Sequence, residues 1–304
     1  MLVQQPAPIQ HLTNNFLSEK GIQLAVLRLD TIHSQVSGNK FFKLKYNLKE
    51  AKRLGKSTIL TFGGAFSNHI YATASAAQSE GFHSIGIIRG EDADLGNPTL
   101  RHSEKMGMDL HFVDRASYRT KDSPGFLQNL RVRFGDFFLI PEGGTNDFAI
   151  KGTQEILNDS HSEYSHFCVS IGTGGTLAGL ATNLKSHQTL IGFSSLKGEF
   201  ISKEVEGLLS TSNIQPEGKL QIQTEYHFGG YGKHNHELIK FIHWFYEEFK
   251  IPLDPIYTGK MAFGVWDLIG KDHFPPGSKI LMIHTGGLQG NVGFTEKTGI
   301  ELPI

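Results

Sequence analysis

The sequence predicts an α/β protein built on doubly wound parallel sheets, and three observations predict this class. Short apolar runs alternate with amphipathic helical segments along most of the 304 residues. Glycine pairs follow directly after several apolar runs, where a strand would turn tightly into a helix. Hydrophobic residues make up 38% and charged residues 19%, the composition of an ordinary globular protein. Because ligands of such sheets bind at the carboxyl ends of strands, the glycine-rich corners are the expected site.

The first half of the chain contains four helical and four extended patterns. A helix over 43–54 is predicted by apolar residues at helical spacing, with Gly55 as its C-cap. A strand over 58–62 is followed by Ser67, the expected N-cap of a helix that runs to residue 80 and is closed by Gly81. The remaining elements are expected as strands at 84–89, 109–113 and 137–140 and as helices at 100–106 and 127–133.

The second half repeats the alternation, and no linker or sequence repeat divides the chain. Strands are expected near 167–170, 190–193, 220–224 and 280–284, and helices near 176–183, 237–249 and 262–269. The length suits one large domain or two ordinary ones.

Composition excludes several classes of function. The formal net charge is −1 and no Lys/Arg block occurs, so neither nucleic acid nor a membrane is an expected partner. Cys168 is the only cysteine, which rules out an intrachain disulfide and a Cys-based zinc site, and no metal is expected. The N-terminus lacks the pattern of a secretory signal, so a cytoplasmic protein is expected.

The strongest local signal is SIGTGGTLAG at 170–179. An apolar strand runs into a glycine-rich turn and then directly into a helix. Backbone N–H groups in such a turn form a cradle for an anion, and Thr173 and Thr176 add hydroxyl donors. The segment is neither a P-loop nor a good dinucleotide fingerprint. It therefore predicts phosphate binding, with a purely structural corner as the alternative.

Two further segments have an ordinary explanation beside a functional one. Lys40 stands between Gly38-Asn39 and a Phe pair, a setting that would desolvate its amine, although most lysines are surface charges. Ser67-Asn68-His69 follows a glycine corner and suits a carboxylate, although N-capping explains Ser67 equally well. Polar residues also end the segments 256–260 and 283–287.

Taken together and in this order, these segments resemble the D-cysteine desulfhydrase and 1-aminocyclopropane-1-carboxylate (ACC) deaminase family. That family belongs to the fold type II enzymes of pyridoxal 5'-phosphate (PLP), the tryptophan synthase β group. The resemblance runs from Gly38 to Gly287 and rests on five ordered motifs. It implies PLP as cofactor, a small amino acid as substrate and a homodimer.

The resemblance also assigns roles to single residues. It makes Lys40 the Schiff-base lysine and Lys43 a neighbour of the phosphate. The implied catalytic residues are Lys40, Ser67, Tyr231 and Tyr257. The implied cofactor-binding residues are Lys40, Lys43, Asn68, Gly172, Thr173, Gly174, Gly175, Thr176, Thr258 and Thr285. The implied substrate-binding residues are Ser67, Asn68, His69 and Tyr257.

Three positions favour D-cysteine as the substrate within this family. Similar deaminases carry Glu after the second tyrosine and Leu after the His of the last strand, where this chain has Thr258 and Thr285. His69 in place of Gln favours the same subfamily. A threonine beside the pyridine nitrogen cannot protonate it, and the weaker electron sink suits elimination of a good leaving group such as thiolate.

The expected reaction is α,β-elimination on D-cysteine to pyruvate, sulfide and ammonia. The alternatives are ACC deamination to 2-oxobutyrate and ammonia, elimination from D-serine or a chlorinated alanine, and a PLP-binding protein without catalysis. In the last case Phe41 and Phe42, which replace the family's usual Thr-Arg, would close or reshape the pocket. Two doubly wound domains are expected, a large one from 1–45 and 147–304 and a smaller one from 46–146, with PLP in the cleft between them.

Overall fold

A computed structural model describes residues 4–304, and its larger sheet joins both ends of the chain. Five of its six strands are parallel, and β1 pairs antiparallel with β2 at one edge. In spatial order the strands are β1 (Ile9–Leu12), β2 (Gln23–Arg28), β10 (Lys279–His284), β7 (His166–Ile171), β8 (Thr189–Ser194) and β9 (Lys219–Gln223).

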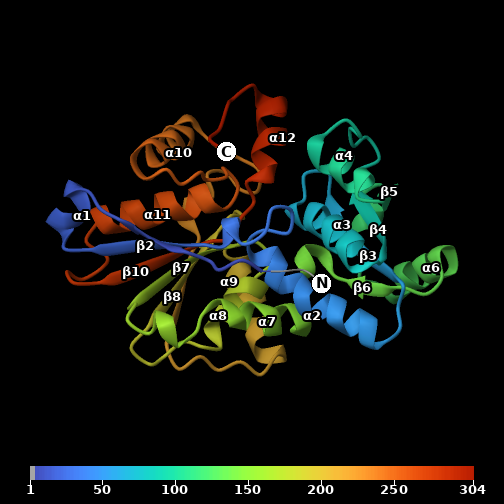
Figure 1. Ribbon diagram of the computed structural model, residues 1–304, viewed down its shortest axis with the longest axis horizontal. Coiled ribbons are helices and arrows are strands. Elements are labelled where there is room, and N and C mark those ends of the chain that lie inside the picture. The colour runs from blue at the N-terminus through green and yellow to red at the C-terminus, as the bar shows by residue number, and fades with distance from the viewer. Residues whose placement is uncertain (1–3) are drawn as a thin grey trace.

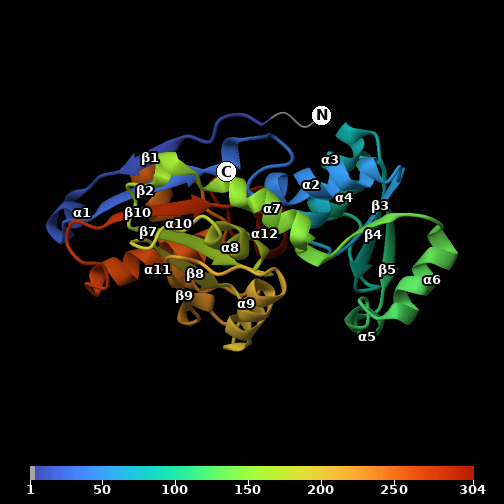
Figure 2. The same cartoon turned by 90° about the horizontal axis from the view of Figure 1, so that it is seen from below.

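The smaller sheet comes from one continuous stretch of chain and is wholly parallel. Its strands, in spatial order, are β5 (Met108–Val113), β4 (His83–Arg89), β3 (Thr58–Gly64) and β6 (Phe138–Ile140). Helices α3 (Asn68–Glu80) and α4 (Pro98–Lys105) pack on one face, whereas α5 (Arg115–Arg119) and α6 (Pro124–Phe134) contribute to the apolar cluster on the other. Figure 2 shows α6 on the side of the small sheet that faces away from the large one.

The large sheet is buried on both faces, which explains why its strands are continuous apolar runs. Along β2, Leu24 and Val26 belong to one hydrophobic cluster and Ala25 and Leu27 to the other. Helices α10 and α11 lie on one side of the sheet and α8 and α9 on the other (Figure 1). The helices around this sheet are α1 (Asn15–Lys20), α7 (Asp147–Thr153), α8 (Gly175–Ala181), α9 (Phe200–Thr211), α10 (His236–Phe249), α11 (Thr258–Gly270) and α12 (Gln289–Thr298).

The predicted fold class is confirmed, and each of the eight predicted strands is present within a few residues of its expected bounds. Ser67 caps α3 and Gly81 ends it in the left-handed conformation, as predicted. Strands β1 and β2 and helices α1, α5, α7, α9 and α12 were not predicted. The helix expected over 43–54 is α2 (Asn39–Arg53), which begins four residues earlier and so places Lys40 in its first turn.

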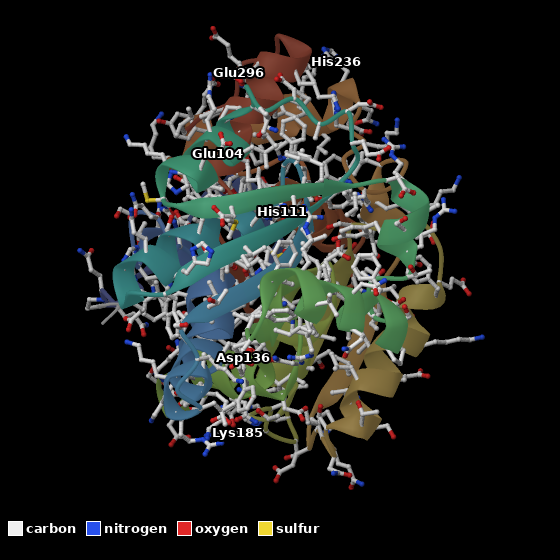
Figure 3. The ribbon with its side chains drawn as sticks, turned by 90° about the vertical axis from the view of Figure 1, so that its right-hand side faces the viewer. Glu104, His111, Asp136, Lys185, His236 and Glu296 are labelled. Carbon is white, nitrogen blue, oxygen red and sulfur yellow. The ribbon has the colours of Figure 1, made fainter. Side chains whose placement is uncertain are left out.

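Contacts between elements join the two sheets into one molecule. Helix α2 packs closely against α7, where a Cβ on Gly152 would lie 1.9 Å from the carbonyl oxygen of Phe42. On the opposite side α12 packs against α4, and Arg101 of α4 forms an ion pair with Glu296 of α12 at 3.2 Å. Figure 3 shows Glu296 on α12 close to α4, which carries Glu104. The domain bounds stay a prediction, and residues 1–3 of the expected large domain lie outside the described residues.

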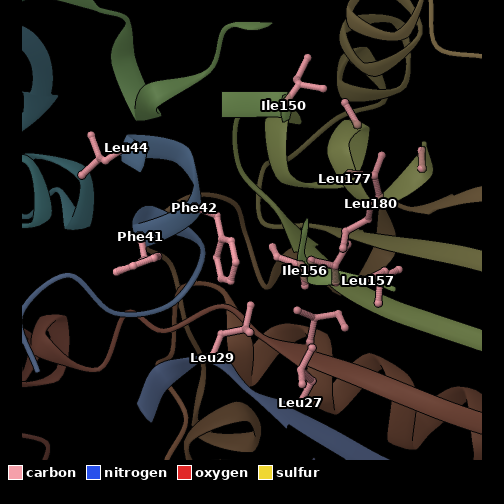
Figure 4. Packing of buried hydrophobic residues seen from close by; sticks show 14 of the residues in the cluster. Leu27, Leu29, Phe41, Phe42, Leu44, Ile150, Ile156, Leu157, Leu177 and Leu180 are labelled. Carbon is pink, nitrogen blue, oxygen red and sulfur yellow. The ribbon is translucent and has the colours of Figure 1, made fainter. Parts of the chain in front are cut away.

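The Phe pair of α2 is part of the core and not of a pocket. Phe41 and Phe42 are each 3% exposed, and Figure 4 shows them among Leu29, Ile156 and other buried aliphatic side chains. Neither ring lines the cavity described below. The alternative in which these rings close or reshape the pocket is therefore excluded, because both pack in the core. Among residues 4–304, no helix is long and apolar enough to cross a membrane.

Candidate active site

A cavity of about 430 Å³ opens where the carboxyl ends of strands from both sheets meet. Gly64 ends β3, Ser170 and Ile171 end β7, and Thr285 follows β10, and all of them line it. This is the edge at which parallel sheets bind ligands. The expected site and the observed cavity therefore coincide.

Most of the residues singled out from the sequence meet in this cavity. Those that line it are Lys40, Lys43, Ser67, Asn68, His69, Gly172, Thr173, Gly174, Thr176, Tyr231, Tyr257 and Thr285. Gly175 and Thr258 are not among the lining residues. The cavity also contains polar residues to which the sequence analysis gave no role, namely Gln35, Ser37, Asn39, Arg89, Glu142, Ser170 and Gln289.

Gly38 places the beginning of α2 against the end of β10. Its φ of +66° lies in the left-handed region, and a Cβ there would be 1.9 Å from the carbonyl oxygen of Thr285. The amide of Asn39 donates to that same oxygen at 3.2 Å, and the Asn39 side chain donates to Thr176 Oγ1 at 2.8 Å. Lys40 therefore lies in the first turn of a helix that is fixed to both the last strand and the glycine-rich loop.

Lys40 and Lys43 are neighbouring cations on the inner face of α2. Burial lowers the pKa of Lys40 to about 8. Burial, and then the charge of Lys40, hold the pKa of Lys43 well below its usual range. Lys43 Nζ donates to Gly143 O and Thr145 Oγ1 at 3.0 Å and to Thr173 Oγ1 at 3.3 Å. Among the described residues, no carboxylate forms an ion pair with either lysine.

The glycine-rich loop is shaped by close contacts as well as by its free amides. Gly174 has a φ of +77°, which favours glycine. A Cβ on Gly172 would lie 3.2 Å from Cε1 of Tyr257, so this glycine makes room for the tyrosine ring. The sequence predicts phosphate binding as the reason for these glycines. Close contact with the Tyr257 ring is a second reason for a glycine at position 172.

Ser67 and His69 occupy the cavity wall at the beginning of α3. Ser67 Oγ accepts the backbone N–H groups of His69 and Ile70, at 3.2 and 3.3 Å, which leaves its hydroxyl proton to donate elsewhere. His69 Nε2 lies 2.8 Å from Thr61 Oγ1, whose proton is donated to the carbonyl of Ile140. The imidazole must therefore donate from Nε2. Burial first, and then the two nearby lysines, hold the pKa of His69 well below its usual range.

Tyr231 and Tyr257 both line the cavity, and their rings are in contact. Their ring centroids are 6.1 Å apart in an edge-to-face arrangement. Loss of water around the hydroxyl raises the pKa of Tyr231, although the residue as a whole is 46% exposed at the cavity mouth. Burial and then the neighbouring Tyr231 raise the pKa of Tyr257 well above its usual value. Both phenols therefore keep their protons at neutral pH.

The two threonines that were expected beside the cofactor lie in different places. Thr285 Oγ1 is 3.1 Å from Ser170 Oγ, and both hydroxyls line the cavity. Thr258 is fully buried, and its hydroxyl donates to the Asp254 carboxylate and accepts the Asp254 amide at 2.9 Å. Thr258 thus holds the beginning of α11. The structure does not bring it to the cavity.

Arg89 and Glu142 are charged residues of the cavity that the sequence analysis missed. Arg89 is the last residue of β4, and a Cβ on Gly64 would lie 3.7 Å from its Nη2. Glu142 is 3.3 Å from Lys121, a cation that it shares with Asp122 at 3.0 Å. The rule that ligands meet the carboxyl ends of strands could have identified Arg89, because it follows the apolar run 84–88 directly. No comparable signal marks Glu142.

Comparison with known proteins identifies the family. A family model described as a pyridoxal-phosphate-dependent enzyme matches residues 2–286. The chain belongs to the pyridoxal-phosphate-dependent enzymes. A Pyrococcus furiosus protein, provisionally named an ACC deaminase, is 31% identical, and the match covers 97% of this chain and 94% of that protein. A D-cysteine desulfhydrase of Klebsiella pneumoniae is 26% identical over 94% of this chain and 93% of the enzyme. These relatives place the chain in the ACC deaminase and D-cysteine desulfhydrase family.

Solved structures agree with this PLP-dependent fold. The crystal structure of an ACC deaminase homologue has a TM-score of 0.84 and 28% identity, covering 98% of this chain and 94% of that one. An O-ureido-L-serine synthase has a TM-score of 0.71 at 16% identity, covering 97% of this chain and 94% of the synthase, and so shares the fold alone.

The residues of this cavity fit PLP. Lys40 offers a buried amine of lowered pKa, which is the nucleophile that a carbonyl cofactor requires. Lys43 brings a second buried cation within 3.3 Å of the loop hydroxyl of Thr173, where a phosphate group would balance its charge. The donor set and the charge of the cavity therefore agree with the cofactor of the family.

Proposed function

We propose that this PLP-dependent enzyme converts D-cysteine and water to pyruvate, hydrogen sulfide and ammonia. The observation that carries the proposal is the Thr285–Ser170 hydroxyl pair, at 3.1 Å, in a cavity whose only acidic lining residue among those described is Glu142. A pyridine nitrogen beside this pair would meet hydroxyl groups and not a carboxylate. A weakly activated ring suits a substrate with a good leaving group.

The proposed roles of the residues follow from their positions. Lys40 would hold PLP covalently through Nζ, with Lys43, Gly172–Gly175 and Thr176 around its phosphate and Asn68 beside its ring. When bound, PLP supplies an electron sink for the pair left on the substrate Cα. Ser67 has a free hydroxyl proton to donate to the substrate carboxylate at the beginning of α3. His69 completes this wall as a neutral Nε2–H imidazole.

Proton transfer is assigned to Lys40 and the two tyrosines. The neutral Lys40 amine accepts the α-proton, the Cβ–S bond breaks, and the sulfur leaves with the bonding electron pair. Tyr231 or Tyr257 donates a proton to the sulfur, because both phenols stay protonated at neutral pH. The released 2-aminoacrylate takes up water to give pyruvate and ammonia. The homodimer suggested by the family resemblance stays a prediction.

ACC deamination is the second candidate, favoured by the names of three Pyrococcus relatives that are 28% to 31% identical. In that reaction Ser67 or Tyr257 would attack the cyclopropane ring. The non-catalytic alternative depended on Phe41 and Phe42 closing the pocket. Both lie in the core and do not line the cavity, so that argument no longer supports it.

The test is product formation by PLP-loaded protein. D-Cysteine is assayed for sulfide and pyruvate, ACC for 2-oxobutyrate, and D-serine and 3-chloro-D-alanine for pyruvate, with Lys40→Ala as the control. Sulfide and pyruvate in equal amounts, without 2-oxobutyrate, support the proposal. 2-Oxobutyrate from ACC without sulfide from D-cysteine would replace it by the second candidate.

A further inference from the structure

Lys260 is a buried cation outside the cavity to which the proposed reaction gives no role. It lies in the first turn of α11 and is 1% exposed. Its Nζ donates to the carbonyl oxygens of His227 and Gly230, both at 2.8 Å. Burial lowers its pKa to about 8, while Asp254 acts in the opposite direction. An ammonium group at such a site needs a structural reason, because burying a charge is costly.

The two acceptor carbonyls belong to an unusual stretch of backbone. Phe228, Gly229, Gly230 and Gly232 all have positive φ, from 52° to 113°. No strand or α-helix hydrogen bonds support these residues, although the amides of Gly230 and Lys233 donate to the same two carbonyls at 3.0 and 3.1 Å. Lys260 is therefore a side-chain clamp on a segment that the backbone alone supports weakly.

This segment carries Tyr231, and α11 carries its partner. Tyr231 comes directly after Gly230, and Tyr257 is the N-cap residue of α11, three residues before Lys260. Asp254 accepts the amides of Tyr257 and Thr258 at 2.7 and 2.9 Å and so holds the Tyr257 side of the pair. Lys260 holds the Tyr231 side. One helix end thus positions both phenols, whose centroids are 6.1 Å apart.

We propose that Lys260 is a positioning residue for Tyr231, holding its phenol against Tyr257 so that a proton can be delivered inside the cavity. The inference rests on the proposed function for its kinetic consequence and on the geometry alone for its structural one. Two kinds of measurement are therefore needed.

The kinetic test is a double-mutant cycle of Lys260→Met and Tyr231→Phe in the PLP-loaded enzyme with D-cysteine. We expect Lys260→Met to lower kcat about tenfold or more, as for a misplaced proton donor, and to change KM and PLP content less than about twofold. In the Tyr231→Phe background the same substitution should lower kcat less than about twofold. Equal losses of kcat in both backgrounds would overturn the proposal.

The structural test does not depend on turnover. Hydrogen–deuterium exchange of residues 228–233 should become faster in Lys260→Met, and exchange that stays at the wild-type rate would overturn the clamp. If the wild-type enzyme leaves D-cysteine unchanged, the proposed function fails while this experiment still decides on Lys260. Lys271→Met, at the exposed end of the same helix, is the matched control and should alter neither readout.

A second variant tests the same role of Lys260 if Lys260→Met does not fold. Lys260→Ala leaves room for a small alkylammonium ion between the carbonyls of His227 and Gly230. Added propylammonium should restore kcat and slow the exchange of 228–233, whereas propanol at the same concentration should not. Rescue by neither compound in a folded, PLP-loaded variant contradicts the role of the charge.

Discussion

The side-chain nitrogens of Lys40 and Lys43 donate to one acceptor, the main-chain carbonyl of Gly143, at 3.3 and 3.0 Å. One neutral oxygen cannot balance two buried ammonium groups. Burial lowers the pKa of both amines, and the charge of Lys40 lowers that of Lys43 further, so an anion beside Lys43 would stabilise its charged form. This geometry agrees with the proposed roles, in which Lys40 binds the carbonyl group of PLP and Lys43 its phosphate.

The rate of covalent cofactor attachment should depend on the ionisation of Lys40. Only the neutral amine attacks the PLP aldehyde, and burial lowers the pKa from 10.5 to about 8. The neutral fraction therefore rises as the pH increases through about 8, and so should the rate. Stopped-flow absorbance of apoprotein mixed with PLP at several pH values measures this midpoint. A midpoint near 10.5 would contradict the buried setting of Lys40.

Loss of Lys43 should weaken PLP binding without removing the covalent link. Lys43→Met deletes a buried charged donor, worth about 1.5–3 kcal/mol, so the dissociation constant should rise by roughly tenfold or more. Titration of apoprotein with PLP measures the change. Lys45→Met is the control, because Lys45 pairs with Glu155 at the surface. A similar loss of PLP affinity in both variants would remove the special role of Lys43.

Gly38→Ala should be far more harmful than a similar change at an open site. A methyl group on Gly38 meets the Thr285 carbonyl at 1.9 Å, and overpacking adds about 1–3 kcal/mol to the strain of positive φ. Gly55 has a φ of +65° and nothing within 4 Å, so Gly55→Ala should cost only about 1–2 kcal/mol in free energy of unfolding. Urea unfolding compares the two variants, and equal losses would show that the close contact is relaxed in solution.

Thr258→Val and Thr285→Val should separate a structural threonine from a functional one. Thr258→Val leaves the buried Asp254 amide without an acceptor, which should lower the free energy of unfolding by about 1–3 kcal/mol with little change in substrate preference. Thr285→Val removes a cavity hydroxyl and should lower kcat instead. Urea unfolding measures the change in stability. The values of kcat with D-cysteine and with D-serine measure the changes in turnover and in substrate preference. A lower kcat in Thr258→Val, together with a loss of stability alone in Thr285→Val, would place Thr258 at the cofactor site instead.

His69 should stay neutral and protonated at Nε2 well below pH 6.5. The Thr61 hydroxyl is committed to the Ile140 carbonyl and so requires a proton on His69 Nε2, while burial and two lysines oppose a second proton. Nitrogen-15 chemical shifts of the ring give the tautomer and the titration directly. An imidazolium at pH 6 would show that the buried network is arranged differently.

The sequence predicts the strands of this protein better than its helices. The eight predicted strands are apolar runs bounded by polar residues or glycine, which is a local signal. Strand β2 contains an equally apolar run, Leu24–Leu27, but no glycine corner follows it and its partner β10 lies some 250 residues later in the chain. Helices α5 and α7, of five and seven residues, show too few turns for a helical period to appear, whereas α8, also of seven residues, was predicted from the glycine-rich turn before it.

The sequence places those candidate site residues best that belong to a motif with a local structural rule. Ser67 caps a helix, and residues 172–176 join a strand to a helix, so local rules place both at a strand end. Thr258 shows the limit of such rules. It stands next to Tyr257, but Tyr257 is the N-cap with non-helical backbone, whereas Thr258 is the first residue of α11 and its side chain is buried against Asp254. Which side of α11 faces the cavity depends on tertiary packing and cannot be predicted from the local sequence pattern.

The pairing of β2 with β10 has a consequence for how the chain folds while it is being made. The small sheet, within residues 58–140, can form once its last strand has left the ribosome, because all its partners have then been synthesised. The parallel partner of β2, strand β10, is made some 250 residues after β2 and after the whole small sheet. Until then β2 has only the antiparallel strand β1 beside it, and its other edge exposes unpaired backbone groups. A truncated or stalled chain should therefore aggregate through residues 23–28, and this segment is where a chaperone would act.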